Sequence, residues 1–255
     1  MSSPTWTPAA LSSEAHRLAG RAWRLVEAQH RVSTLKLVDD LDEQAVLEAL
    51  IEETKPLVPA ECRGLGYLLA TPFRYAAAYP RGSRFRRAGR TAGVFYASET
   101  AATAVAEMAF WRLLFFVESP TTPWPADAAE YTAFAALFDT ARAIDLARPP
   151  LDADTSAWEH PTDYAACQAL ADAARTADVE VIRYRSVRDP DRGGNLALLT
   201  CRAFAAPEPV ERQTWRIRLG RTGVQAICEF PAARIGFDRA AFAADPRIAT
   251  MRWDR

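Results

Sequence analysis

Residues 62–98 read CRGLGYLLATPFRYAAAYPRGSRFRRAGRTAGVFYAS, and the run AATAVAEMAFWRLLFF follows at residues 101–116. The first segment has no Asp or Glu but holds seven arginines: Arg63, Arg74, Arg81, Arg84, Arg86, Arg87 and Arg90. The second segment carries one acid, Glu107, in largely apolar surroundings. An arginine-rich segment that leads into an apolar helix with one acid indicates a site that holds an anionic ligand and acts on its electropositive part.

Aromatic residues, among them Tyr75 and Tyr96, are interleaved with these arginines. An arginine fork binds phosphate through two hydrogen bonds, and a pyrophosphate needs at least two such donors. Aromatic rings stack on nicotinamide or adenine. Two other interpretations fit the same residues: a solvated basic face, and a surface that binds RNA.

Glu107 has no cationic neighbour at helical spacing, because Thr103, Ala104, Phe110 and Trp111 occupy those positions. An ion pair along the helix is therefore not its purpose. Burial of an unpaired carboxylate is costly, and such groups concentrate at active sites. The alternative is that Glu107 lies on a narrow wet stripe of an otherwise buried helix.

The 255-residue chain is 49% hydrophobic and has a formal net charge of −1. This length can bury a sizeable core, and the neutral balance argues against a nucleic-acid coat or a polybasic membrane surface. We expect a cytoplasmic protein, since no run could span a bilayer and no secretory signal is visible.

The four cysteines, Cys62, Cys167, Cys201 and Cys228, lie far apart in the sequence. They form no C-x-x-C motif, and no histidine nearby completes a zinc-binding spacing. We therefore expect four reduced thiols and no metal site.

Hydrophobic spacing predicts amphipathic helices over about 9–30 and 40–54, the second capped by Asp39 or Asp40. The segments GYLLATPFRY and GVFYAS resemble strands, and Ser98 is a suitable N-cap for a helix over about 99–116, with Glu99 complementing its dipole. Residues 132–147 are β-like or mixed, and a helix is expected over 162–176.

The sequence pattern of the second half of the chain predicts two strand pairs. VEVIRYRS and NLALLTCRAF are joined through the turn-rich DPDRGG, and PVERQTWRIRL with GVQAICEF indicates a hairpin. The sequence therefore predicts an α+β (mixed α/β) fold.

The sequence lacks the motifs of several common classes of enzyme. Ser186 ends VEVIRYRS just before a turn, so a plain turn serine is one interpretation, and there is no G-x-S-x-G. Leu69 stands where a dinucleotide fingerprint needs its third glycine, and no Walker motif, HExxH or carboxylate cluster is present.

Taken in order, these segments resemble the RES domain family, named for its Arg, Glu and Ser. The resemblance spans roughly residues 66–205, with eleven residues from Tyr96 to Glu107. It rests on PFRY (Arg74, Tyr75), GSRFRRAG (Arg84), GVFYAS (Tyr96), AVAE (Glu107), and YRS followed by GGNLAL (Ser186, Asn195).

The resemblance implies an ADP-ribosyltransferase-like core with a cleft for NAD+, and a bacterial toxin that degrades NAD+ as its substrate, by hydrolysis or phosphorolysis of the nicotinamide–ribose bond. It also implies an Xre-like antitoxin partner with a DNA-binding region, whose tail blocks the cleft. Growth arrest would follow from loss of NAD+.

The resemblance assigns roles to the matching residues. Glu107 would stabilise the oxocarbenium-like ribose, with Arg84 and Tyr96 as further catalytic residues. Arg84 and Arg74 would hold the pyrophosphate, and Tyr96 and Tyr75 would pack on nicotinamide and ribose. Ser186 and Asn195 would also bind NAD+.

Residues 1–62 are expected to form an N-terminal helical extension to a catalytic domain over 63–255. The extension has three possible roles: shaping the cleft, forming a homodimer, or binding the antitoxin. Two rival functions stay open. One is mono-ADP-ribosylation of a protein, although Val105 replaces the first acid of the E-x-E of arginine-specific transferases. The other is a non-catalytic RNA- or protein-binding module.

Overall fold

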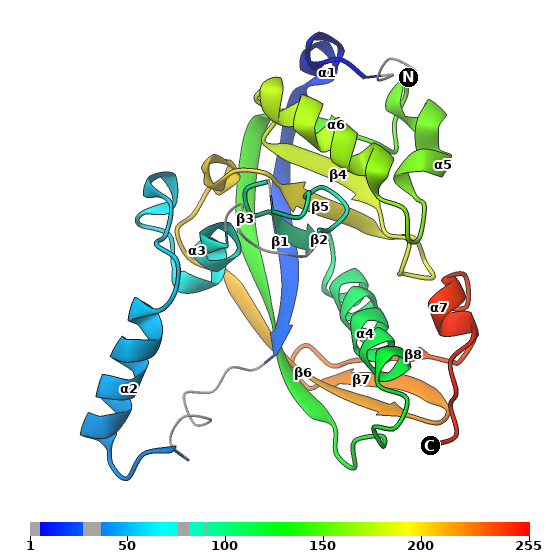
Figure 1. The fold of residues 1–255 in the computed structure, drawn as a ribbon. Coiled ribbons are helices and arrows are strands. Elements are labelled where there is room, and N and C mark those ends of the chain that lie inside the picture. Colours follow the sequence, from blue (N-terminus) through cyan, green and yellow to red (C-terminus); the bar gives the residue numbers. More distant parts are fainter. Residues whose placement is uncertain (1–5, 28–36, 76–81, 90) are drawn as a thin grey trace.

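The computed structural model describes residues 6–27, 37–75, 82–89 and 91–255. Its described strands form one mixed sheet in the order β1-β2-β5-β4-β3-β6-β7-β8 (Figure 1). The strands are β1 (His16–Glu27), β2 (Phe95–Ser98), β3 (Ala129–Asp145), β4 (Val181–Arg185), β5 (Gly194–Leu198), β6 (Glu211–Gly220), β7 (Gly223–Cys228) and β8 (Ala233–Phe237). The helices are α1 (Pro8–Glu14), α2 (Leu41–Glu53), α3 (Tyr67–Arg74), α4 (Ala101–Glu118), α5 (Thr155–Trp158), α6 (Ala165–Thr176) and α7 (Pro246–Ala249).

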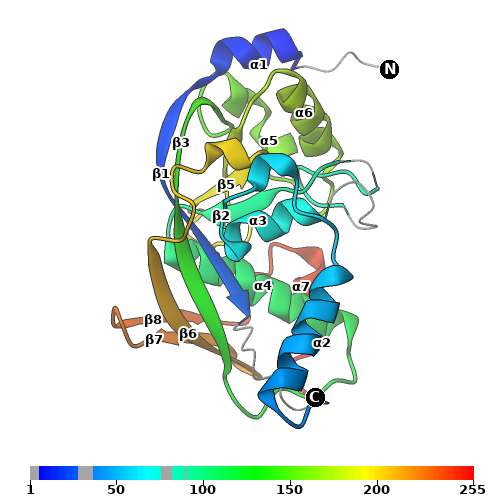
Figure 2. The ribbon, with the colours of Figure 1, turned by 90° about the vertical axis from the view of Figure 1, so that its left-hand side faces the viewer.

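The strand β1 closes part of this sheet into a ring. It pairs antiparallel with β3 from Leu18 opposite Thr140 to Glu27 opposite Tyr131, and it meets β2 where Trp23 lies opposite Ser98. The strands β1, β2, β5, β4 and β3 are therefore hydrogen-bonded in a closed circuit, from which β6, β7 and β8 extend along β3. Figures 1 and 2 show β1 and β3 side by side along their length.

Three apolar clusters hold the helices to the sheet. The helix α4 buries Val105, Ala109 and Leu113 against β1, β3 and the β6–β8 strands. The helix α6 packs on β4 and β5, and α3 packs with β2 and the middle and end of β3 in a third cluster.

The predicted helix over residues 9–30 is wrong beyond its first turns. Within the described part of this range, Pro8–Glu14 is helical and residues 16–27 form β1, while residues 28–30 lie outside the described residues. The apolar positions there also suit a strand, in which Trp23 and Leu25 point to one face and are buried. Pairing with β3, which lies more than a hundred residues away, decides between the two patterns and overrides local propensity.

The predicted strand GYLLATPFRY is also wrong, because Tyr67–Arg74 is the helix α3. Its buried residues Leu69, Ala70 and Phe73 have helical spacing. In so short a segment, the sequence alone did not distinguish this spacing from the alternating pattern of a strand. The second predicted helix is confirmed as α2, with Asp40 accepting from the backbone of Asp42 and Glu43 as its N-cap.

The start of the central helix differs by two residues from the prediction. Thr100, not Ser98, caps α4 by accepting from the backbone N–H of Thr103. Ser98 is the last residue of β2 and donates to Asn195 instead, and Glu99 accepts from Arg183 on β4. Ser98 therefore belongs to the strand, and Glu99 lies between the strand and the N-cap of the helix.

The predicted strand pairs of the second half are confirmed. The strands β4 and β5 are antiparallel neighbours, and β6 and β7 form a hairpin. Most of the mixed segment over 132–147 belongs to one long strand, β3, which runs from Ala129 to Asp145. The α+β class is confirmed, with an N-terminal helix present, whereas the division of the chain at residue 62 stays a prediction.

The expectation of four reduced cysteines is wrong for two of them. Cys62 and Cys201 are joined by a disulfide, with Cα atoms 5.4 Å apart, while Cys167 and Cys228 are free and buried. A sequence separation of 139 residues hid this proximity from sequence analysis. Among the described helices, none is long and apolar enough to cross a membrane.

The ring predicts that residues 1–62 are needed for folding. A chain that begins at residue 63 lacks β1, so β3 loses its longest pairing and the buried Trp23 and Leu25 are lost from the core. We expect no cooperative thermal unfolding of this shortened chain by circular dichroism. A cooperative transition near that of the full chain would contradict the expectation.

A matched control lies within the same 62 residues. Val46 and Leu50 on α2 are more than half exposed, so replacing both with Ser removes no core contact. We expect this double variant to unfold within about 0.5 kcal/mol of the unchanged protein.

Candidate active site

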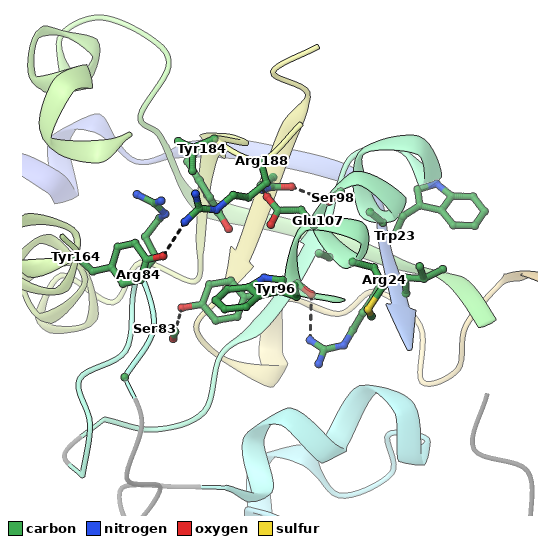
Figure 3. Close-up of a pocket in the computed structure, with 18 residues that line it drawn as sticks. Trp23, Arg24, Ser83, Arg84, Tyr96, Ser98, Glu107, Tyr164, Tyr184 and Arg188 are labelled. Atoms are coloured by element: carbon green, nitrogen blue, oxygen red, sulfur yellow. Dashed lines mark hydrogen bonds between the residues drawn. The ribbon is translucent and has the colours of Figure 1, made fainter. Parts of the chain in front are cut away.

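A cavity of about 340 Å³ opens beside the start of α4 (Figure 3). This volume is within the range of small-molecule sites. Strand register builds its floor. Trp23 of β1 lies opposite Ser98 of β2, Ser98 opposite Asn195 of β5, and Asn195 opposite Tyr184 of β4. All four residues line the cavity, so one row of side chains crosses four strands below it.

Glu107 reaches this floor from α4 and is held by two side-chain donors. Its Oε1 accepts from Ser186 Oγ at 2.7 Å and from Asn195 Nδ2 at 2.6 Å. The Oδ1 atom of Asn195 accepts in turn from Ser98 Oγ at 2.7 Å, which fixes the orientation of the amide. Oε2 of Glu107 has no hydrogen-bond partner among the described residues. One oxygen is thus used to position the carboxylate, and the other is available to a ligand.

Ser186 lies behind the carboxylate rather than at the cavity surface. It is 1% exposed, and its Oγ accepts from the backbone N–H groups of Arg188 at 3.1 Å and Asp189 at 2.9 Å. These two bonds occupy the lone pairs of the hydroxyl, so its single proton is donated to Glu107. Ser186 therefore positions Glu107.

The glycines of GGNLAL let β5 approach the start of α4. A Cβ atom at Gly193 would lie 2.1 Å from Oγ1 of Thr103, in the first turn of that helix. Asn195 follows two residues later and reaches Glu107 one turn further along α4. The close approach of strand and helix needs a residue without a side chain at this point.

Tyr96 is positioned through its hydroxyl group. The oxygen accepts from the backbone N–H of Phe85 at 2.9 Å and lies 2.8 Å from Ser83 Oγ. Burial raises the pKa of this phenol, so it stays neutral at physiological pH. The ring lines the cavity and ties it to the loop that carries Arg84.

Arg84 lines the cavity with a buried guanidinium group. Nη1 donates to the carbonyl of Trp158 at 2.5 Å and Nη2 to the carbonyl of His160 at 3.1 Å, while the group lies 4.7 Å from the centre of the Tyr164 ring. No described carboxylate lies within ion-pair distance of it. Neutral groups therefore hold the guanidinium group in place, and no described acid neutralises its charge.

Sequence analysis missed Arg188, which lines the same cavity. Its Nη1 donates to Asp245 of the α7 N-cap at 2.7 Å, Nη2 donates to the carbonyl of Pro161, and the guanidinium lies 3.9 Å from the centre of the Phe110 ring. Its place two residues after Ser186 was the available sequence signal. Its partner Asp245 lies 57 residues further along the chain and gave none.

Arg24 of β1 was also missed, because its segment was expected to be helical. It lines the cavity and donates from Nη1 to the carbonyl of Tyr96 at 3.0 Å. Trp23 and Leu25, its neighbours in β1, line the cavity as well. The N-terminal extension therefore contributes directly to the site.

The structure does not bring Arg74 and Tyr75 to this cavity. Arg74 is buried at the end of α3 and forms an ion pair with Glu52 of α2, and Tyr75 follows it with its carbonyl bonded to Arg86. Arg87 pairs with Asp172, and Arg81 and Arg90 lie outside the described residues. The described arginines of this segment thus mostly bond to other groups of the protein and do not form one basic face.

Among the described residues, one group of three could place metal-ligand atoms together: Glu61, Cys62 and Cys201. None of the three lines the cavity, and the two thiols are bonded to each other.

The buried pair of Arg188 and Asp245 predicts a strong stability effect. Burial opposes the charged form of Asp245, yet hydrogen bonds from Arg247 and the charges of Arg188 and Arg247 outweigh it and hold the carboxyl pKa below its usual value. The pair's contribution is therefore complete above about pH 4 and is lost as the pH falls through the lowered pKa.

We expect Asp245→Ala to lower the free energy of unfolding at pH 7 by about 3–5 kcal/mol, because it leaves Arg188 buried without a counter-charge. Chemical denaturation measures this loss. Arg247→Ala is the control: Arg247 also pairs with Asp245 but is partly exposed, and its loss is expected to cost about 1 kcal/mol or less. Equal effects of the two variants would contradict the assignment.

A model of the RES domain family matches residues 58–220 of this chain. Among solved structures, the chain is similar to the crystal structure of the M. tuberculosis MbcT–MbcA toxin–antitoxin complex. The identity is 12%, the TM-score is 0.43, and the similarity covers 92% of this chain and 96% of that one. No curated protein matches. Because the family model matches more than half of the chain's length, the chain belongs to the RES domain family.

Proposed function

We propose that this protein is a toxin that cleaves the nicotinamide–ribose bond of NAD+. The observation that carries the proposal is the Glu107 carboxylate, held by Ser186 and Asn195 with one oxygen left available. It lies in a small-molecule cavity that also presents arginine side chains and tyrosine rings. A dinucleotide with negative phosphates and a positively charged pyridinium suits that combination of groups.

In the proposed reaction, the bond from ribose C1′ to the nicotinamide nitrogen breaks and its electron pair stays with nicotinamide, which leaves as a neutral molecule. Positive charge develops on the ribose. Glu107 would stabilise that charge, as a carboxylate does in glycoside hydrolysis. Because Ser186 and Asn195 already orient the carboxylate, little reorganisation is needed when the charge appears.

The second half of the reaction needs an acceptor. Water or inorganic phosphate would attack C1′, and the proton that water gives up would pass to Glu107 or to solvent. Tyr96, a neutral ring on the cavity wall, would pack against nicotinamide or ribose. The charge of Arg84, which no described carboxylate pairs, would raise the positive potential of the cavity and so favour an anionic substrate.

Transfer of ADP-ribose to a protein would use the same first step. Val105, which stands where arginine-specific transferases carry the first acid of their E-x-E motif, is fully buried on the core face of α4. Transfer to an arginine acceptor is therefore disfavoured, and water or phosphate is favoured over it. The RNA-binding alternative is disfavoured because the described arginines of the arginine-rich segment mostly bond to acids and carbonyls within the protein.

The proposed partner is an Xre-like antitoxin with a DNA-binding region, whose tail blocks the cavity. We expect both proteins to act in the cytoplasm. We expect co-expression of the antitoxin to restore growth and NAD+ levels together. Restored growth with NAD+ still depleted would contradict inhibition at this site.

Glu107→Gln tests the proposed reaction, because it keeps the size of the side chain and removes its charge. We expect NAD+ loss in cells, measured shortly after induction, to fall by a factor of about a thousand or more, since charge stabilisation at the reacting centre is lost. Purified protein should retain its melting temperature within a few degrees.

Glu118→Gln is the matched control, because Glu118 is an exposed acid at the far end of the same helix. It should leave NAD+ loss unchanged. If Glu107→Gln consumes NAD+ as fast as the control does, Glu107 is not the catalytic carboxylate. If the unchanged protein consumes no NAD+, the proposed function is wrong.

A further inference from the structure

The strand β1 precedes the segment that matches the family, yet it supplies Arg24 to the cavity. We propose that Arg24 is a substrate-binding residue that holds the diphosphate of the dinucleotide. This inference rests on the proposed function, whose substrate class it specifies further. It assigns to the N-terminal extension a direct part in recognition.

The hydrogen bonds of Arg24 leave donors unused. Nη1 donates to the carbonyl of Tyr96, and the guanidinium lies 5.1 Å from the centre of the Phe95 ring. Arg24 has no other hydrogen bond to a described residue, and no described carboxylate lies within 4 Å of it. A guanidinium has five N–H donors, so most of them remain for a ligand.

The other arginines of β1 show that this isolation is specific to Arg24. Arg17 pairs with Asp139 at 2.7 Å, and Arg21 pairs with Glu211 at 2.6 Å. Both of those pairs are largely exposed, whereas Arg24 is half-buried. The strand therefore neutralises its solvent-facing arginines and leaves the charge at the cavity without a partner.

Desolvation at Arg24 lowers its pKa to about 10, so the side chain is still charged at neutral pH. A partly desolvated charge without a counter-ion is unfavourable in the free protein. A bound anion would supply the missing counter-charge, and it would do so in an environment that strengthens electrostatic attraction.

The remaining cavity arginines are more fully engaged. Arg188 is paired with Asp245, and both terminal nitrogens of Arg84 donate to carbonyl groups. Figure 3 shows Arg24 bonded to the backbone of Tyr96, well apart from Glu107. A dinucleotide with its reacting ribose at Glu107 would place its phosphates away from that carboxylate, on the side where Arg24 offers free donors.

The test compares substrates with and without phosphate. NAD+ carries the diphosphate, and nicotinamide riboside carries the same scissile bond without it. For Arg24→Ala, we expect the KM for NAD+ to rise about ten- to hundredfold, while kcat/KM for nicotinamide riboside stays within about twofold. Arg21→Ala, from the same strand, is the control and should change neither.

A purely structural role gives a different result. If Arg24 only holds β2 through the Tyr96 carbonyl, its loss would impair both substrates equally, and that outcome would overturn the proposal. Unchanged kinetics on NAD+ would overturn it as well. Arg24→Gln keeps a donor for the carbonyl and serves as the second variant, with the same loss expected on NAD+ alone.

A binding measurement separates this inference from the proposed function. ADP-ribose contains the diphosphate but not the scissile bond, and its affinity is measured by calorimetry on Glu107→Gln protein with and without Arg24→Ala. A ten- to hundredfold weakening supports the assignment of Arg24, even if the unchanged protein consumes no NAD+. Equal affinity, or no binding to either protein, would refute it.

Discussion

The row of residues Trp23, Ser98, Asn195 and Tyr184 across four strands is the constraint on which the site depends. Side chains alternate between the faces of a strand, so a slip of one residue in any of these pairings would turn that floor residue away from the cavity. Asn195 would then no longer reach Glu107. The closed circuit of the ring resists such slips, because each strand is held on both sides.

Three arginine side chains surround that floor, and each is held by groups from a different part of the chain. Arg188 has its counter-charge in Asp245, beyond the segment that matches the family, and Arg84 is held by carbonyl groups of a neighbouring loop. Arg24 enters from the opposite end of the chain. The N-terminal strand thus lines the cavity, and Asp245 near the C-terminus holds one of its arginines, which gives a physical reason for a chain longer than its RES core.

Much of the fold followed from local patterns. The strand pairs β4–β5 and β6–β7 were visible because turn residues and alternation lie within a few residues of one another. The helix α4 was visible because its apolar run is long. The identity of β1 was not, since a short apolar pattern fits both helix and strand until a distant partner such as β3 supplies the hydrogen bonds.

The sequence by itself determined that Glu107 is an isolated acid in an apolar helix, and that Tyr96, Ser186 and Asn195 belong to the same set of motifs. Only the tertiary structure decided what each residue contacts. It turned Arg74 toward Glu52, placed Ser186 behind the carboxylate, and brought Arg24 and Arg188 to the cavity. The reason is that charge pairing and burial depend on contacts between residues far apart in the chain, which local spacing does not encode.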